Sequence, residues 1–135
     1  MVERSCRLQV DASMNDSPMS LGEARQALHQ ASQRQLDAES AYRQAVEELA
    51  GADLAYNRAV ARKMVELHAD GVAWTAAKPL ALGDQAVSQL RYERDVNRGV
   101  VDAAESGRYR LQADRRSLEG IVNWSMRREL AEGGM

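Results

Sequence analysis

A seven-residue repeat of alanine limits most strongly what this chain can fold into. The repeat comprises Ala24, Ala31, Ala38, Ala45, Ala52 and Ala59. Three residues before each alanine runs a second column of mostly larger side chains, Leu21, Leu28, Gln35, Tyr42, Leu49 and Tyr56. Two columns with this spacing form one stripe along an α-helix, and a seam of alanines lets a neighbouring helix approach closely. Alanine could also recur because it is the best helix former, but six in register favour a packed seam.

The choice of apolar residues also argues against a sheet. The chain has no Phe, two Trp and four Tyr, and alanine supplies much of its apolar content. Sheets and sandwiches fill their layers with bulky β-branched and aromatic side chains. We therefore expect an all-α fold with a coiled-coil-like, alanine-rich seam.

The first helix is expected to span residues 20–68. Ser20 and Glu23 have the spacing of a capping box at its start. Gly51 costs about 1 kcal/mol inside a helix, but the repeat passes through it without a shift, which indicates one unbroken helix. Gly71 can adopt the left-handed conformation that ends a helix.

A second helix is expected over residues 84–130, after a connector at 69–83. Within the connector, Pro79 disfavours a helical Lys78 and is suited to open a brief turn. Asp84 is a favourable N-cap for the second helix. The apolar positions of that helix are Val87, Leu90, Val100, Val101, Ala104, Leu111, Leu118, Ile121 and Val122.

Two helices of similar length joined by a short connector predict a long antiparallel hairpin over residues 20–135. Residues whose numbers sum to about 154 would lie opposite each other, for example Ala52 and Asp102–Ala103. Residues 1–19 are expected to form a flexible tail, with a short strand at Arg7–Val10 as the alternative for part of it.

One partner helix leaves part of the apolar surface uncovered. The apolar side chains expected on this second flank are Val46, Val60, Leu67, Val100, Leu111 and Ile121. Two copies of the hairpin would bury them in a four-helix arrangement, so we expect a homodimer or a higher bundle.

The sequence contains no pattern that indicates catalysis or a cofactor. It lacks the common phosphate-binding, zinc-protease and serine-hydrolase motifs, and its one cysteine, Cys6, has no histidine near it in sequence. His68 with Asp70 and Asp84 could hold a divalent ion, but capping or solvent-facing roles are favoured. No apolar run approaches the ~20 residues that cross a bilayer. We expect a cytoplasmic protein that is not an enzyme, needs no cofactor and does not bind membranes.

Two surfaces are candidates for binding. Trp74, Leu80 and Leu82 in the connector could contact a partner protein or simply close the end of the hairpin. The second surface is a cluster of arginines that could follow the phosphates of a nucleic acid, Arg108, Arg110, Arg115, Arg116, Arg127 and Arg128. A solvated face with ion pairs to acidic residues of the first helix is the favoured interpretation, because Arg115 and Arg116 point in different directions on a helix.

The segment from Leu67 to Asp95 contains a pattern made by Thr75, Ala76, Ala77, Lys78, Leu80, Ala81, Gly83 and Asp84. In these positions the segment resembles small proteins of uncharacterised function encoded in phages and prophages of Gram-positive bacteria. Pro79 departs from the family pattern, in which a polar residue is more usual. The resemblance covers about residues 40–125 and implies an accessory protein in the bacterial host, with no catalytic residues.

The expected function is therefore binding of another protein by a helical hairpin within a phage or prophage programme. A nucleic-acid-associated factor in replication or recombination is the second interpretation. An inhibitor of a host enzyme or defence system is the third.

Overall fold

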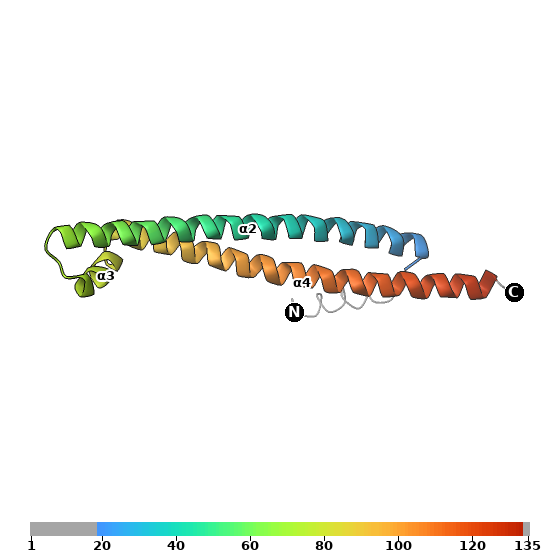
Figure 1. Ribbon diagram of the computed structural model, residues 1–135. Coiled ribbons are helices and arrows are strands. Elements are labelled where there is room, and N and C mark those ends of the chain that lie inside the picture. The colour runs from blue at the N-terminus through green and yellow to red at the C-terminus, as the bar shows by residue number, and fades with distance from the viewer. Residues whose placement is uncertain (1–18, 134–135) are drawn as a thin grey trace, which may run out of the picture. The chain divides into compact units, whose positions relative to one another are not determined.

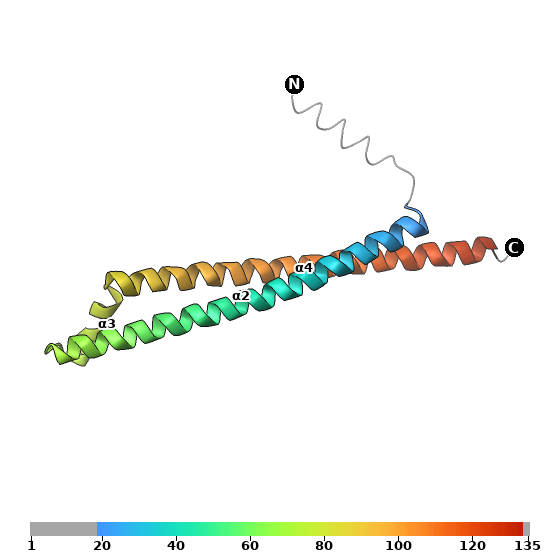
Figure 2. The same ribbon diagram turned by 90° about the horizontal axis from the view of Figure 1, so that it is seen from above.

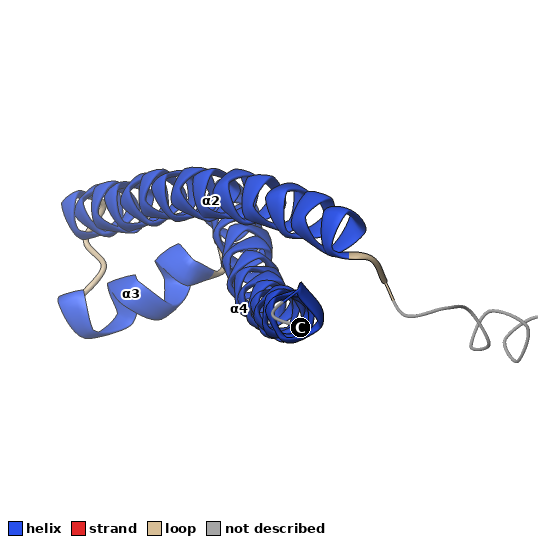
Figure 3. Cartoon of the chain, turned by 90° about the vertical axis from the view of Figure 1, so that its right-hand side faces the viewer, coloured by secondary structure: helices blue, strands red, loops and turns tan. Residues whose placement is uncertain are grey.

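The computed structural model describes residues 19–133, which form three α-helices. These are α2 (Leu21–Ala69), α3 (Trp74–Leu82) and α4 (Gln85–Gly133), and Figure 1 shows them in chain order. Figure 3 shows helices and loops but no strand in this described range, so the expected all-α class is confirmed. The expected tail at 1–19, apart from Met19, and the alternative strand at Arg7–Val10 lie outside the described residues.

The chain divides into two compact units, and each contains an antiparallel pair of segments from α2 and α4. One unit is Ala31–Asp114, which also contains α3. In the other, the described residues are 19–30 and 115–133. The long helices pack against each other within each unit, as a hairpin requires.

Both ends of α2 carry the caps that the sequence predicts. The backbone N–H of Glu23 donates to Ser20 Oγ at 3.1 Å. At the other end, Gly71 has a φ of 97°, in the left-handed region. The N–H of Gly71 donates to the carbonyl of His68, and the N–H of Val72 donates to that of Leu67, which is the Schellman arrangement.

The sequence-based expectation of a brief turn opened by Pro79 is wrong. The helix α3 begins five residues earlier, at Trp74, and runs through Pro79. Proline removes one intrahelical donor, but Ala77 and Ala81 of the same helix are fully buried. Figures 1 and 2 place α3 beside the last turns of α2, so packing there offsets the missing hydrogen bond.

Asp84 caps the start of α4. Its Oδ2 accepts hydrogen bonds from the backbone N–H groups of Ala86 and Val87, at 3.1 and 3.2 Å. These two groups have no partner inside the helix, so the carboxylate satisfies donors that would otherwise face water. The helix therefore starts where the sequence predicts its cap.

The alanine column of α2 lies on the packed side of the helix. Ala24, Ala31 and Ala45 are 0%, 5% and 5% exposed. The other three alanines and the larger column are half-buried, except for Tyr56, which is buried. The two columns therefore form one continuous face on the buried side of α2.

The packed side of α4 follows two columns as well. One comprises Val87, Arg94, Val101, Arg108, Arg115 and Val122. The other comprises Leu90, Asn97, Ala104, Leu111, Leu118 and Ser125. All twelve residues are buried or half-buried. Val100 and Ile121, which were expected on the second flank, lie outside these columns and are exposed, whereas Leu111 of that expected flank lies in a packed column.

The register within the unit Ala31–Asp114 differs from the expected sum of about 154. Three ion pairs join α2 to α4 or to its cap, Glu39–Arg108, Asp53–Arg94 and Lys63–Asp84, and each has a sum of 147. Because Lys63 lies opposite Asp84, residues 64–69 of α2 extend past the start of α4. The helix α3 lies beside this extension of α2.

Candidate functional site

The same cluster of an arginine, a tyrosine and a carboxylate occurs twice between α2 and α4. In the first, the Arg108 guanidinium lies 4.2 Å from the centre of the Tyr42 ring and its Nη1 donates to Glu39 Oε2 at 3.3 Å. In the second, the Arg94 guanidinium lies 4.5 Å from the Tyr56 ring, and Asp53 Oδ1 is 3.8 Å from Arg94 Nε. Corresponding residues are two heptads apart on each helix. We call these two clusters the arginine–tyrosine clasps.

Both clasp arginines stay charged. Hydrogen bonding to Asp95 is the main cause that raises the pKa of Arg94, against an opposing effect of desolvation. For Arg108, desolvation acts to lower the pKa, but the hydrogen bond and charge of Glu39, with Tyr109, raise it overall. A raised pKa favours the protonated form, so each guanidinium attracts both its carboxylate and the face of its tyrosine.

The clasps change how the arginine cluster of the second helix should be interpreted. Arg108 contacts α2, Arg115 pairs with Glu119, and Arg128 pairs with Glu132. The other three are exposed and make no ion pair with any residue of 19–133; they are Arg110, Arg116 and Arg127. Half of the cluster is therefore engaged in ion pairs within the chain, and the other half is exposed.

The turn between α2 and α3 holds an aromatic stack. The rings of His68 and Trp74 lie 4.0 Å apart between centroids, with an angle of 16° between their planes. His68 Nδ1 donates to the carbonyl of Val72 at 3.1 Å, which fixes the histidine ring. Trp74 is nevertheless 50% exposed. One face of the indole thus rests on a fixed ring while part of the side chain remains accessible.

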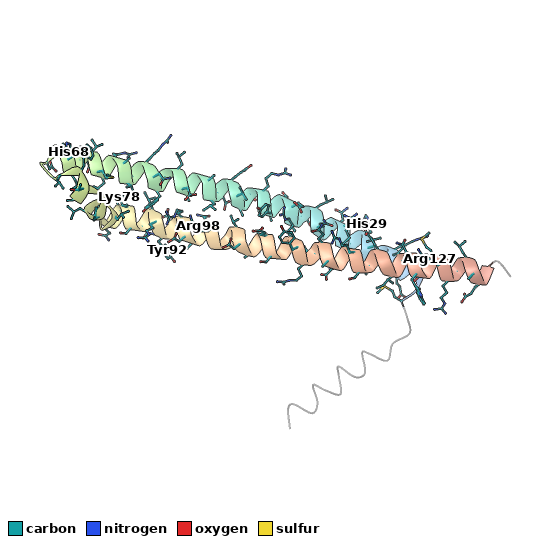
Figure 4. All side chains as sticks on the ribbon, turned by 60° about the horizontal axis from the view of Figure 1, so that its bottom comes forward. His29, His68, Lys78, Tyr92, Arg98 and Arg127 are labelled. Atoms are coloured by element: carbon teal, nitrogen blue, oxygen red, sulfur yellow. The ribbon has the colours of Figure 1, made fainter. Side chains whose placement is uncertain are left out.

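The exposed side of α3 continues this apolar surface. Leu80 is 54% exposed, whereas Leu82 is half-buried. The turn-facing His68 and the exposed Lys78 are labelled in Figure 4 at this end of the unit. We call Trp74 and Leu80 the tip. Leu82, which was expected to share the contact surface, is less accessible than they are.

The structure does not form a metal or catalytic centre from the residues considered for one. No group of three metal-ligating side chains occurs within residues 19–133. His68 stacks on Trp74, while Asp84 caps α4 and lies 3.7 Å from Lys63 Nζ. Cys6 lies outside the described range.

A second aromatic surface was not identified from the sequence. In the unit of residues 19–30 and 115–133, Trp124 and Ile121 are exposed and line an open apolar groove with Met19 and Gly120. The Arg128 guanidinium lies 5.6 Å from the Trp124 ring. In the sequence, the signal that could have indicated this surface was the second tryptophan, Trp124. Because residues 1–18 precede Met19 and are not described, we assign no function to this groove.

Among the described helices, none is long and apolar enough to cross a membrane. No protein-family model, curated protein or solved structure matches the chain. The candidate sites therefore rest on the geometry of this chain alone.

Proposed function

We propose that this protein is a non-enzymatic binding module whose hairpin tip contacts another protein. The observation that supports this most is the exposure of Trp74 despite the stacked His68 ring beneath it. A large aromatic side chain that is already fixed loses little conformational entropy when a partner covers it. Leu80 on the same short helix extends the apolar contact.

The proposal includes a phage or prophage setting. The only support for this setting is the resemblance of residues 75–84 to the small phage and prophage proteins. That match covers α3 from its second residue and the cap of α4, and it contains Leu80 of the tip but not Trp74. Inhibition of a host enzyme is one form that such binding could take, and the identity of the bound protein would decide it.

The test is photo-cross-linking from the tip. A photoreactive amino acid replaces Leu80, and a matched variant carries it at Ala61, which is exposed on α2. In lysate of a Gram-positive bacterium, we expect specific adducts from position 80 and none from position 61. Excess unlabelled wild-type protein should suppress them, whereas excess Trp74→Ala protein should not. Equal adducts from both positions, or equal competition by both proteins, would contradict the proposal.

The nucleic-acid interpretation makes a different prediction. Three of its six arginines are held in ion pairs within the chain, so few remain to neutralise phosphates. We expect labelled single- and double-stranded DNA to show no micromolar binding at low salt. Binding in that range that weakens steeply as salt rises would favour the nucleic-acid function instead.

A further inference from the structure

The side of α4 that faces away from α2 carries apolar residues that the described chain leaves uncovered. Tyr92, Val96 and Val100 are 64%, 48% and 47% exposed. Their four-residue spacing places them on one side of the helix. Figure 4 shows Tyr92 pointing away from α2. This surface lies on a different helix from the tip.

The same side of α4 changes character after Val100. Ala103 is exposed, and Gly107 follows one turn later. A Cβ added at Gly107 would meet no atom within 4 Å, so packing among the described residues does not require a glycine there. Glycine is nevertheless among the least favourable residues inside a helix. The surface thus has a protruding half before residue 101, where Tyr92, Val96 and Val100 surround Gly99, and a flat half after it.

Tyr92 is the first residue of the protruding half, and Arg110 is the last residue of the flat half. They are 18 residues apart, which is five helical turns, so they share one side of α4 at a separation of about 27 Å. The side chain of neither residue makes a hydrogen bond, ion pair or ring contact with any of residues 19–133. Arginine over tyrosine is the contact that this chain already uses in both clasps.

We propose that a second copy of the chain covers this side, with the two α4 helices antiparallel about a twofold axis at residue 101. The axis places Tyr92 of each copy opposite Arg110 of the other, so the contact forms twice. It also sets the protruding half of each helix against the flat half of its partner. Val96 then lies over Ser106–Gly107.

The charges near this surface agree with the twofold arrangement. Asp114 is placed opposite Ser88, so the arrangement does not set it against another acidic residue. Tyr92 is flanked in the chain by Arg91 and Glu93, whose opposite charges leave no net charge beside the incoming Arg110. A parallel arrangement would instead set Tyr92 against Tyr92 and Arg110 against Arg110, which leaves the two guanidinium groups facing each other.

The test uses the symmetry of the arrangement and is read by sedimentation equilibrium. Tyr92→Arg sets a guanidinium against Arg110 at both ends, so the dissociation constant should rise about 5- to 30-fold. The double swap Tyr92→Arg/Arg110→Tyr recreates both contacts and should restore the wild-type value. Val100→Glu should abolish the dimer. The matched control is Leu54→Glu on α2, which also replaces an exposed apolar side chain and should leave the dimer intact.

Circular dichroism on each variant is the check that its helices remain folded. For the wild-type protein, the thermal midpoint should rise with protein concentration, because folding and association are linked. A 14.9 kDa monomer from micromolar to millimolar concentration would overturn the proposal. A double swap no tighter than Tyr92→Arg would overturn it too. Trp74→Ala should leave the dimer unchanged, so failure of this proposal is distinguishable from failure of the proposed tip function.

Discussion

Replacing Ala45 by leucine tests the alanine seam most sharply. Ala45 is 5% exposed on the packed side of α2, and leucine adds three heavy atoms where almost no accessible space remains. Overpacking of this kind costs about 1–3 kcal/mol. For a chain of this length, 1 kcal/mol corresponds to a shift of the thermal midpoint of about 3–5 °C. We therefore expect the midpoint of Ala45→Leu to fall by about 3–15 °C.

The controls are Ala50→Leu and Ala55→Leu, both at exposed positions of the same helix. The intrinsic helix propensity changes equally in all three variants, so only the packing differs. Each control should stay within about 0.5 kcal/mol of the wild type in urea denaturation. Ala52 is half-buried, and leucine there should have an intermediate effect. Equal midpoints across the four variants would refute the packed seam.

Three further predictions concern two glycines, the second clasp and the cap of α4. Gly51→Ala should raise the free energy of unfolding by about 0.5–1 kcal/mol, because the added Cβ would meet open space. Gly71→Ala should lower the free energy of unfolding, because φ at this residue is 97°. Chemical denaturation measures both changes, and a change of the same sign at both sites would contradict this prediction. Asp53→Arg should lower the thermal midpoint, and adding Arg94→Asp should recover part of the loss. No recovery in the double variant would show that the two residues do not face each other. Asp84→Ala should cost about 1 kcal/mol through loss of two cap hydrogen bonds, and an unchanged urea midpoint would argue against that cap.

The local features of α2 could be predicted because each depends on nearby residues. The seven-residue repeat sets which side is packed, and Ser20 and Gly71 set the ends through their own hydrogen bonds and backbone conformation. The register between the helices could not be predicted in this way. Helix lengths give a register only if the connector is symmetric, and α3 makes it asymmetric by lying beside the end of α2.

The clasps show the other limit. Arg94 and Arg108 occupy packed columns of α4, yet charged residues are expected on the surface, so Arg108 was considered for nucleic acid instead. Their long apolar stems can lie along a packed surface while the guanidinium reaches a tyrosine face. The signal was present in the spacing, since Tyr42–Tyr56 and Arg94–Arg108 are both 14 residues apart. Pairing them required the register, which only the structure provided.

The most direct test of the account is therefore the register of α2 against α4. Ala55 and Glu93 each come immediately before a residue of the Tyr56–Arg94 contact, so cysteines at these two positions should lie side by side. In a Cys6→Ser background at low protein concentration, a short bismaleimide should join Ala55→Cys to Glu93→Cys within one chain. The matched pair is Ala55→Cys with Val100→Cys, whose numbers follow the sum of about 154 expected from helix lengths alone. This pair should react far more slowly, because residue 100 lies seven residues, or about 10 Å, farther along α4 than residue 93. Faster reaction of the second pair, measured by peptide mass spectrometry, would contradict the clasps and the register built on them.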